Sequence, residues 1–294
     1  MKDLLNRYGV TLTTIFVALT TFWLAMLVVL PNLYLFENSF RPYLPVAEIG
    51  GPKDVYSLNN YLTFFQSPIH ISVFVWTILY SSLVTLICFA VAYPMAYYLA
   101  KVANRRLLPT LFLLLFVPLW VSEVLRSFAW FIILALKGPL NFLLLGSGLI
   151  DAPVRWVTGY RGVMIGLVYT YVLFMLFPLY NAISSLDTNQ IEAAEDLGAP
   201  WWRIHWRVIL PHAKPGIASG SVMVFMLSVG SILVPTLLAS TTSRWFTEII
   251  QQWMFESQDW NTGSAYAFLL LILCTVFVSL VMRVFRVSLS DIAK

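Results

Sequence analysis

The sequence predicts an all-α integral membrane protein with about six transmembrane helices and one cytoplasmic coupling helix. Three observations support this fold class. The chain of 294 residues is 60% hydrophobic and only 11% charged, whereas soluble domains contain about 25% charged residues. Several apolar runs reach the roughly 20 residues that a helix needs to cross a bilayer. Lysine and arginine gather in alternate connecting segments, as they do in multi-pass proteins.

The apolar runs set the order of the elements. The first run is too long for the apolar part of a cleavable signal peptide, so it is expected to span the membrane. The third run contains Glu123 and Arg126, which interrupt its apolar character. We place the spans at 8–36, 69–100, 107–136, 162–183, 215–240 and 263–282, and loops at 37–68, 137–161 and 241–262.

The distribution of basic residues predicts the orientation of the chain. Eleven lysines and arginines fall on the side of both termini, against six on the other side. The excess of positive charge marks the cytoplasmic side, so we expect both termini and the segment 189–214 in the cytoplasm. The net charge of +4 is explained by this bias and needs no nucleic acid partner. The eleven are Lys2, Arg7, Lys101, Arg105, Arg106, Arg203, Arg207, Lys214, Arg283, Arg286 and Lys294.

Two glycine pairs with a spacing of four residues predict close packing between helices. Gly162 and Gly166 lie in the fourth span, and Gly216 and Gly220 lie in the fifth. Small residues at this spacing let another helix approach closely. The partner could be a helix of the same chain or of another subunit, and the sequence leaves both open.

The polar segment 189–214 reads NQIEAAEDLGAPWWRIHWRVILPHAK. We expect Asn189 to cap a first helix together with Glu192, each side chain binding the other's free backbone N–H. Gly198 is expected to stop that helix in the left-handed conformation, and Pro200 to begin a second helix over 201–209. Pro211 is expected to end it. The result is a helix–turn–helix on the membrane surface, with three tryptophans at headgroup depth: Trp201, Trp202 and Trp206.

The spacing of Glu192-Ala193-Ala194, Gly198, Val208 and Leu210-Pro211 resembles the cytoplasmic coupling loop of permease subunits in ABC-type importers. The resemblance implies a type I importer permease fold, with residues 1–294 as one transmembrane permease domain in the bacterial inner membrane. It also implies docking roles: Glu192 offers a charged anchor, Ala193 and Ala194 permit close contact, and Gly198 fixes the angle between the helices. The alternative is a plain amphipathic connector, which leaves its acidic face on a basic membrane side unexplained.

Glu123 and Arg126 are the only acid and base well inside a predicted span. Charged residues there usually face the bundle interior and mark a function. Three residues apart on a helix, they could instead neutralise each other as a structural pair, and both interpretations stay open. Aromatic faces beside one carboxylate suit an organic cation, whereas the arginine suits a carboxylate or phosphate. The candidate solute path is Trp120, Glu123, Arg126, Trp130 and Tyr169.

The stretches 118–130 and 166–187 look like the corresponding parts of spermidine and putrescine importer permeases, and most of all the first of the two permeases. This resemblance implies the import of a small organic cation, a polyamine such as putrescine or spermidine. The family also imports other small amines and opine-like or amino-acid-like solutes. One departure is that Pro235-Thr-Leu-Leu is followed by Ala239-Ser240-Thr241 where the family often has paired glycines.

The partners follow from what the chain lacks and from the resemblance. No Gly-x-x-x-x-Gly-Lys-Ser/Thr phosphate loop occurs, so ATP and Mg²⁺ are expected on separate ATPase subunits, and this chain is expected not to be an enzyme. The resemblance implies two ATPase subunits, a second homologous permease and an external solute-binding protein, with lipid around the spans. Two cysteines and three scattered histidines predict no metal or redox site.

Two other classes are weaker alternatives. A self-powered secondary carrier would need acids or bases on several spans for ion coupling, and only the third span has them. A membrane enzyme would need a nucleophile–base or metal-ligand cluster, and the sequence offers none. We therefore expect ATP-driven transport by an assembly that includes this chain.

Overall fold

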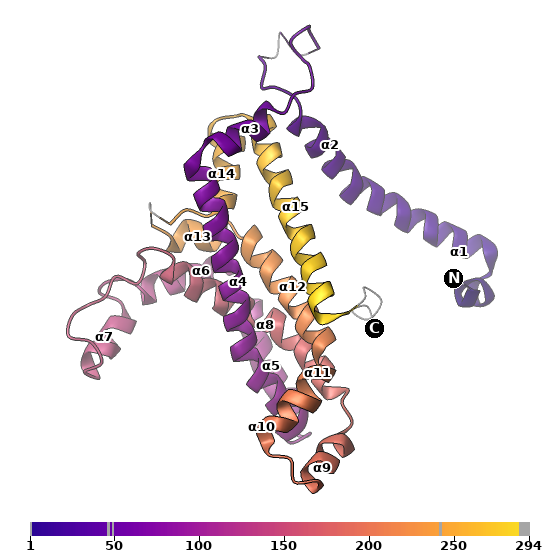
Figure 1. Cartoon of the computed structure of the whole chain (residues 1–294), viewed down its shortest axis with the longest axis vertical. Helices are drawn as coiled ribbons and strands as arrows, with labels where there is room; N and C mark the ends of the chain where they lie inside the picture. Colours follow the sequence, from indigo (N-terminus) through magenta and orange to yellow (C-terminus); the bar gives the residue numbers. More distant parts are fainter. Residues whose placement is uncertain (1, 46–47, 49, 241–242, 288–294) are drawn as a thin grey trace. The chain divides into compact units, whose positions relative to one another are not determined.

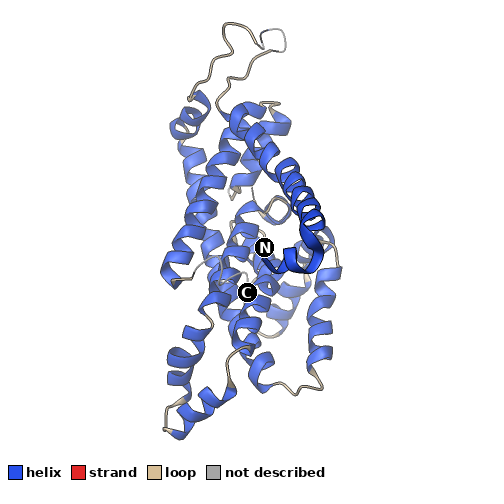
Figure 2. Cartoon of the chain, turned by 90° about the vertical axis from the view of Figure 1, so that its right-hand side faces the viewer, coloured by secondary structure: helices blue, strands red, loops and turns tan. Residues whose placement is uncertain are grey.

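The computed structural model describes residues 2–45, 48, 50–240 and 243–287. Within these ranges every regular element is a helix, and no strand occurs (Figure 2). The chain forms two compact units, Met1–Pro68 with Ile250–Leu271 and Ile69–Ile249 with Ile272–Lys294. The expectation of one permease domain over 1–294 stays a prediction. Thr241 and Lys294, used above, lie outside the described residues.

The predicted all-α membrane fold is confirmed, and it includes two bent helix pairs. Four helices of the described chain are long and apolar enough to cross a membrane: Gly9–Ser39, Pro68–Val102, Arg161–Ser184 and Trp260–Phe285. The third predicted span is Leu108–Trp120 (α5) followed by Glu123–Ile133 (α6), with an angle of 87° between them. The fifth region joins Trp201–His212 to Lys214–Gly230 at 71°. Counting each bent pair as one span gives six.

The first unit contains the N-terminal helix and the loop that follows it (Figure 1). α1 (Lys2–Leu24), the π-helical turn Ala25–Val29 and α2 (Leu30–Ser39) follow one another, and α3 (Asn59–Gln66) closes the loop. In that loop the Asn60 amide donates to Ser39 O at 2.9 Å and Arg41 O at 2.8 Å. Arg41 pairs with Glu37 at 2.6 Å and Asp54 at 2.9 Å. Hydrogen bonding to Glu37 raises the pKa of the Arg41 guanidinium. Polar contacts therefore link the described residues of this loop to one another.

The second unit is built around α8 (Arg161–Ser184), which packs against α12 (Lys214–Gly230) and α13 (Leu233–Leu238). A Cβ on Gly216 would lie 2.5 Å from Pro178 O, and one on Gly220 would lie 2.7 Å from Met175 Sδ. A Cβ on Gly166 would lie 2.5 Å from Leu238 Cδ1. These glycines therefore pack against helices of the same chain. Of the two interpretations of the glycine pairs, the structure supports packing within the chain.

Both of the later loops contain helices that the sequence analysis did not place. α7 (Pro139–Gly146) lies within 137–161, and α14 (Phe246–Gln251) with the π-helical turn Gln252–Glu256 lies within 241–262. Local chemistry begins each of them. Pro139 occupies the first helical turn of α7, where its missing N–H costs nothing. The Glu248 carboxylate accepts from Trp245 N at 2.7 Å, as in a capping box.

Candidate functional site

The segment predicted as a coupling loop forms the expected helix–turn–helix. α9 (Thr188–Asp196) is followed by α10 (Trp201–Ile204), the π-helical turn His205–Ile209 and α11 (Leu210–His212). Figure 1 shows α9 and α10 at the lower end of the second unit, beyond the ends of α8 and α12. The loop therefore projects from the helices that it connects.

The cap of α9 differs from the expected one. Asp187, and not Asn189, is the N-cap, and its Oδ1 accepts from the Asn189 backbone N–H at 3.0 Å. The chain enters the helix two residues earlier than expected, and a carboxylate there also suits the helix dipole. Glu192 consequently has no hydrogen bond to the backbone N–H of Asn189 among the described contacts.

The end of α9 follows the expectation closely. Gly198 has φ +75°, the left-handed conformation that favours glycine. Its N–H donates to Glu195 O at 2.8 Å, and the N–H of Ala199 donates to Ala194 O at 3.0 Å. These two bonds form a Schellman motif, which satisfies carbonyls at the helix end and turns the chain toward Pro200.

Pro211 does not end the second helix, contrary to expectation. The helix continues through Pro211 to His212, and the chain bends at Ala213 before α12. Pro211 lacks the N–H that would bind the preceding turn. The wide turn His205–Ile209 immediately precedes it, and irregular turns of this kind absorb such a break.

The loop presents an apolar face with an acidic neighbour to its surroundings. Leu197 is 88% exposed and Trp201 74% exposed, and both Glu192 and Ala193 are exposed. Ala194 instead packs against the core of the second unit. Large apolar side chains exposed on one short segment are typical of a protein contact surface. Inward-facing side chains hold the loop on the core, and these are Ile191, Ile204 and Ile209.

His205 is one of the three histidines for which the sequence predicted no site. It connects the coupling loop to α4 (Pro68–Tyr97). Its Nδ1 lies 2.6 Å from Tyr93 Oη, and its ring packs edge-on against Tyr97 at 4.6 Å between centroids. The Lys101 ammonium adds a hydrogen bond to Leu186 O. The only signal in the sequence is the single imidazole among three tryptophans, which does not identify a partner 112 positions away.

The candidate solute-path residues surround the break between α5 and α6. Val121 and Ser122 are extended, with ψ 132° and 139°, so Glu123 begins α6. Tyr171 on α8 donates a hydrogen bond to Glu123 Oε1 at 3.3 Å. Glu123 therefore lies at the first residue of α6 and not inside one straight helix, because the two halves of the third predicted span are bent by 87°.

Arg126 does not pair with Glu123 in the structure. The ion pairs of the described residues all lie in the loop between Glu37 and Asp54. The Arg126 Nε is buried without a hydrogen-bond partner, which is costly for a charged group. The structural pair that the sequence left open is therefore not formed, and the hydrogen-bond donor to the Glu123 carboxylate is Tyr171.

The aromatic candidates are brought together only in part. Trp130 on α6 packs edge-on against Tyr169 on α8, with centroids 5.3 Å apart. Both line an apolar cavity of about 570 Å³. Trp120 is 73% exposed at the end of α5 and has no such contact.

Comparison with known proteins places this architecture in a family. Residues 89–290 match the model of the family described as the binding-protein-dependent transport system inner membrane component. The chain belongs to this family. It is a multi-pass inner-membrane permease subunit of the ABC importer type and not an enzyme. The matched range covers both the coupling loop and the break before Glu123.

Two curated relatives and one solved structure illustrate the similarity of the permease. It is 33% identical over 274 residues to the spermidine/putrescine transport system permease protein PotB of Salmonella typhimurium, covering 92% of this chain and 94% of that one. It is 35% identical over 243 residues to PotB of Escherichia coli, covering 83% and 86%. A bacterial alginate ABC transporter, in complex with its alginate pentasaccharide-bound periplasmic protein, matches with a TM-score of 0.72 and 19% identity over 98% and 99%.

Proposed function

We propose that this permease carries a polyamine such as putrescine or spermidine across the inner membrane into the cytoplasm. The single observation that supports this solute class is the 33% identity to PotB over 92% of the chain. Glu123 adds a physical reason, since an anionic side chain offsets the lost hydration of a polycation. Trp130 and Tyr169 add aromatic faces that attract ammonium groups.

The proposed partners supply what this chain does not. Two ATPase subunits bind ATP and Mg²⁺ and close on each other, and a solute-binding protein delivers the polyamine from outside. A second permease, a homologous but different chain, completes the pathway. The exposed surface of Glu192, Ala193, Leu197 and Trp201 docks onto an ATPase subunit. Gly198 keeps α9 and α10 at the angle that this contact needs, and Leu210-Pro211 ends the docking motif.

Transport by the whole assembly tests the proposal. We expect cells that lack their own polyamine uptake to accumulate labelled putrescine or spermidine when they express this permease with its ATPase, partner permease and binding protein. Uptake should stop when the ATPase subunit carries a phosphate-loop substitution. Uptake that continues without ATP hydrolysis would identify a secondary carrier instead.

The buried, unpartnered Arg126 Nε favours a second candidate, a solute that carries a carboxylate beside its amine, such as an opine or amino acid. For a polyamine, Arg126→Gln removes a repelling charge, so uptake should be kept or increased while Glu123→Gln lowers it. For a carboxylate-bearing solute, Arg126→Gln should lower uptake as well. Uptake of both solute classes by the two variants separates the candidates.

A further inference from the structure

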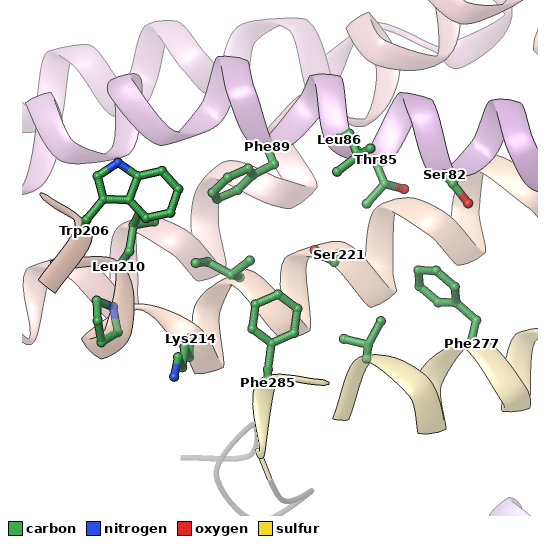
Figure 3. A pocket seen from close by; sticks show the side chains of 13 residues that line it. Ser82, Thr85, Leu86, Phe89, Trp206, Leu210, Lys214, Ser221, Phe277 and Phe285 are labelled. Atoms are coloured by element: carbon green, nitrogen blue, oxygen red, sulfur yellow. The ribbon is translucent and has the colours of Figure 1, made fainter. Parts of the chain in front are cut away.

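A long groove runs beside the coupling loop, within the second unit (Figure 3). Its volume is about 660 Å³. Phe89 on α4, Ile217 on α12 and Phe285 on α15 (Trp260–Phe285) contribute to its walls. Neither Glu123 nor any other acidic residue lines it. It is therefore a separate feature from the proposed solute path.

The groove offers few free polar groups despite the hydroxyls in its wall. Ser82 donates to Ile78 O and Thr85 donates to Ser81 O, each at 2.8 Å. These hydroxyls are thus satisfied within α4 and leave a mainly apolar wall. A ligand that fits this part of the groove is itself apolar, and a polyamine is not.

One end of the groove is basic and aromatic. Figure 3 shows Lys214 and Trp206 at the same end, with Ser82 and Phe277 toward the other. Lys214 is exposed and has no ion-pair partner among the described residues. Trp206 is 69% exposed. This end adjoins the coupling loop, where positive charge and tryptophan are typical of the headgroup region.

The length of the groove fits one leaflet of a bilayer. From Phe277 to Phe285 the wall follows nine residues of α15, and the eight steps between them rise about 12 Å at 1.5 Å per residue. One leaflet contributes about 15 Å of hydrocarbon. An acyl chain that enters beside Lys214 therefore remains in contact with the groove over most of its length.

We propose that this groove binds a phospholipid with an anionic headgroup. The acyl chain lies along Leu86, Phe89 and Phe277, and the phosphate lies beside the Lys214 ammonium, with the Trp206 indole at the boundary. Basic pockets between helices on the cytoplasmic side suit anionic headgroups, and one lysine near such a surface gives about a fivefold preference. The proposal concerns lipid binding alone and does not depend on which solute is carried.

Native mass spectrometry of the purified full-length complex tests the headgroup preference. After delipidation, the complex is incubated with micelles that contain equal amounts of phosphatidylglycerol and phosphatidylethanolamine. We expect about a fivefold excess of phosphatidylglycerol adducts, set by one lysine at the headgroup, and a ratio near one for Lys214→Gln. Arg105→Gln, which removes an exposed cation outside the groove, is the matched control and should keep the excess. An unchanged ratio for Lys214→Gln overturns the proposal.

A photo-cross-linking residue at the exposed Leu86 identifies the occupant directly in the assembled complex. We expect an adduct with the mass of a phospholipid, and its loss when Ser221→Trp fills the groove. A cross-link to the second permease subunit would show that a protein helix occupies the groove and would overturn the proposal. Because wild-type packing surrounds the probe, this measurement does not require the Lys214 variant to assemble.

Discussion

Tyr171 makes a contact with Glu123 that the sequence did not predict. It is only 6% exposed, and its hydroxyl donates to Glu123 Oε1 at 3.3 Å. Arg126, three residues further along α6, makes no such contact among the ion pairs of the described residues. A neutral donor holds the carboxylate in place without cancelling its charge, which leaves the charge available to a cationic solute.

Tyr171→Phe tests this positioning role. The substitution keeps the ring but removes a hydrogen bond to a charged group, which contributes about 1.5–3 kcal/mol. We expect lower uptake, with a smaller loss than for Glu123→Gln, measured as initial rates in cells. The double variant should be no worse than Glu123→Gln alone, because the charge that Tyr171 holds in place is already absent in Glu123→Gln.

Tyr169→Phe is the matched control for this pair, since Tyr169 contacts Trp130 and not Glu123. Its effect should add to that of Glu123→Gln. Full additivity between Tyr171→Phe and Glu123→Gln would contradict the positioning role of Tyr171.

Gly198 is the second decisive single residue. A Cβ at this position would meet nothing within 4 Å, so any cost of a substitution comes from its φ of +75°. A β-branched side chain there costs about 1–3 kcal/mol, whereas asparagine tolerates this conformation better. We expect Gly198→Val to reduce the ATPase subunits that co-purify with the permease, and Gly198→Asn to reduce them much less.

The measurement is the ratio of ATPase to permease after purification, with uptake assayed in parallel. Glu192→Lys, which reverses an exposed charge without backbone strain, separates loss of the docking charge from loss of the turn. Equal ATPase recovery in Gly198→Val, Gly198→Asn and wild type would rule out the proposed role of the turn in docking.

Among the elements, the contact of α12 with α8 depends on the absence of a side chain at Gly216. An alanine Cβ would lie 2.5 Å from Pro178 O and 2.6 Å from Ala182 Cβ, so the helices must separate. Overpacking of this kind costs about 1–3 kcal/mol. We expect Gly216→Ala to lower the thermal unfolding midpoint of the purified permease in detergent.

Gly146→Ala at the end of α7 is the control, because its Cβ would meet nothing within 4 Å. It should leave the unfolding midpoint unchanged. If both substitutions lowered the midpoint equally, the tight approach of α12 to α8 would not be the cause.

At the scale of the whole molecule, the distribution of lysine and arginine predicts that the loop 37–68 is outside and the coupling loop inside. The structure selects suitable positions for labelling, since Leu58 is 60% exposed and Leu197 88% exposed. With Cys88 and Cys274 replaced, we expect Leu58→Cys to react with a membrane-impermeant maleimide in intact cells. In cells that express the permease without its ATPase subunits, Leu197→Cys should react only after the membrane is opened.

The reverse labelling pattern would invert the orientation and place the coupling surface away from any cytoplasmic ATPase. Labelling of both positions in intact cells would indicate that the cells are leaky. The control is an endogenous cytoplasmic protein with a reactive cysteine, which should stay unlabelled in intact cells. Ser57 is less suitable, because its hydroxyl oxygen is buried.

The sequence by itself determined the class of protein, the candidate spans and the helix–turn–helix within 189–214. These follow from local properties: apolar length, charge bias, and the requirement of a left-handed turn for glycine at position 198. Local properties did not predict the start of α9. Both Asp187 and Asn189 have side chains that can cap a helix, and the structure shows Asp187 as the N-cap.

Only the tertiary structure decided which side chains meet. Glu123 contacts Tyr171 and not Arg126, since the break at Val121–Ser122 turns α6 onto α8. The tertiary structure also joined His205 to Tyr93, and it assembled the groove at Lys214 from helices distant in sequence. Sequence spacing gives neighbours along one helix, whereas contacts between helices depend on bends and crossing points that arise from packing of the whole chain.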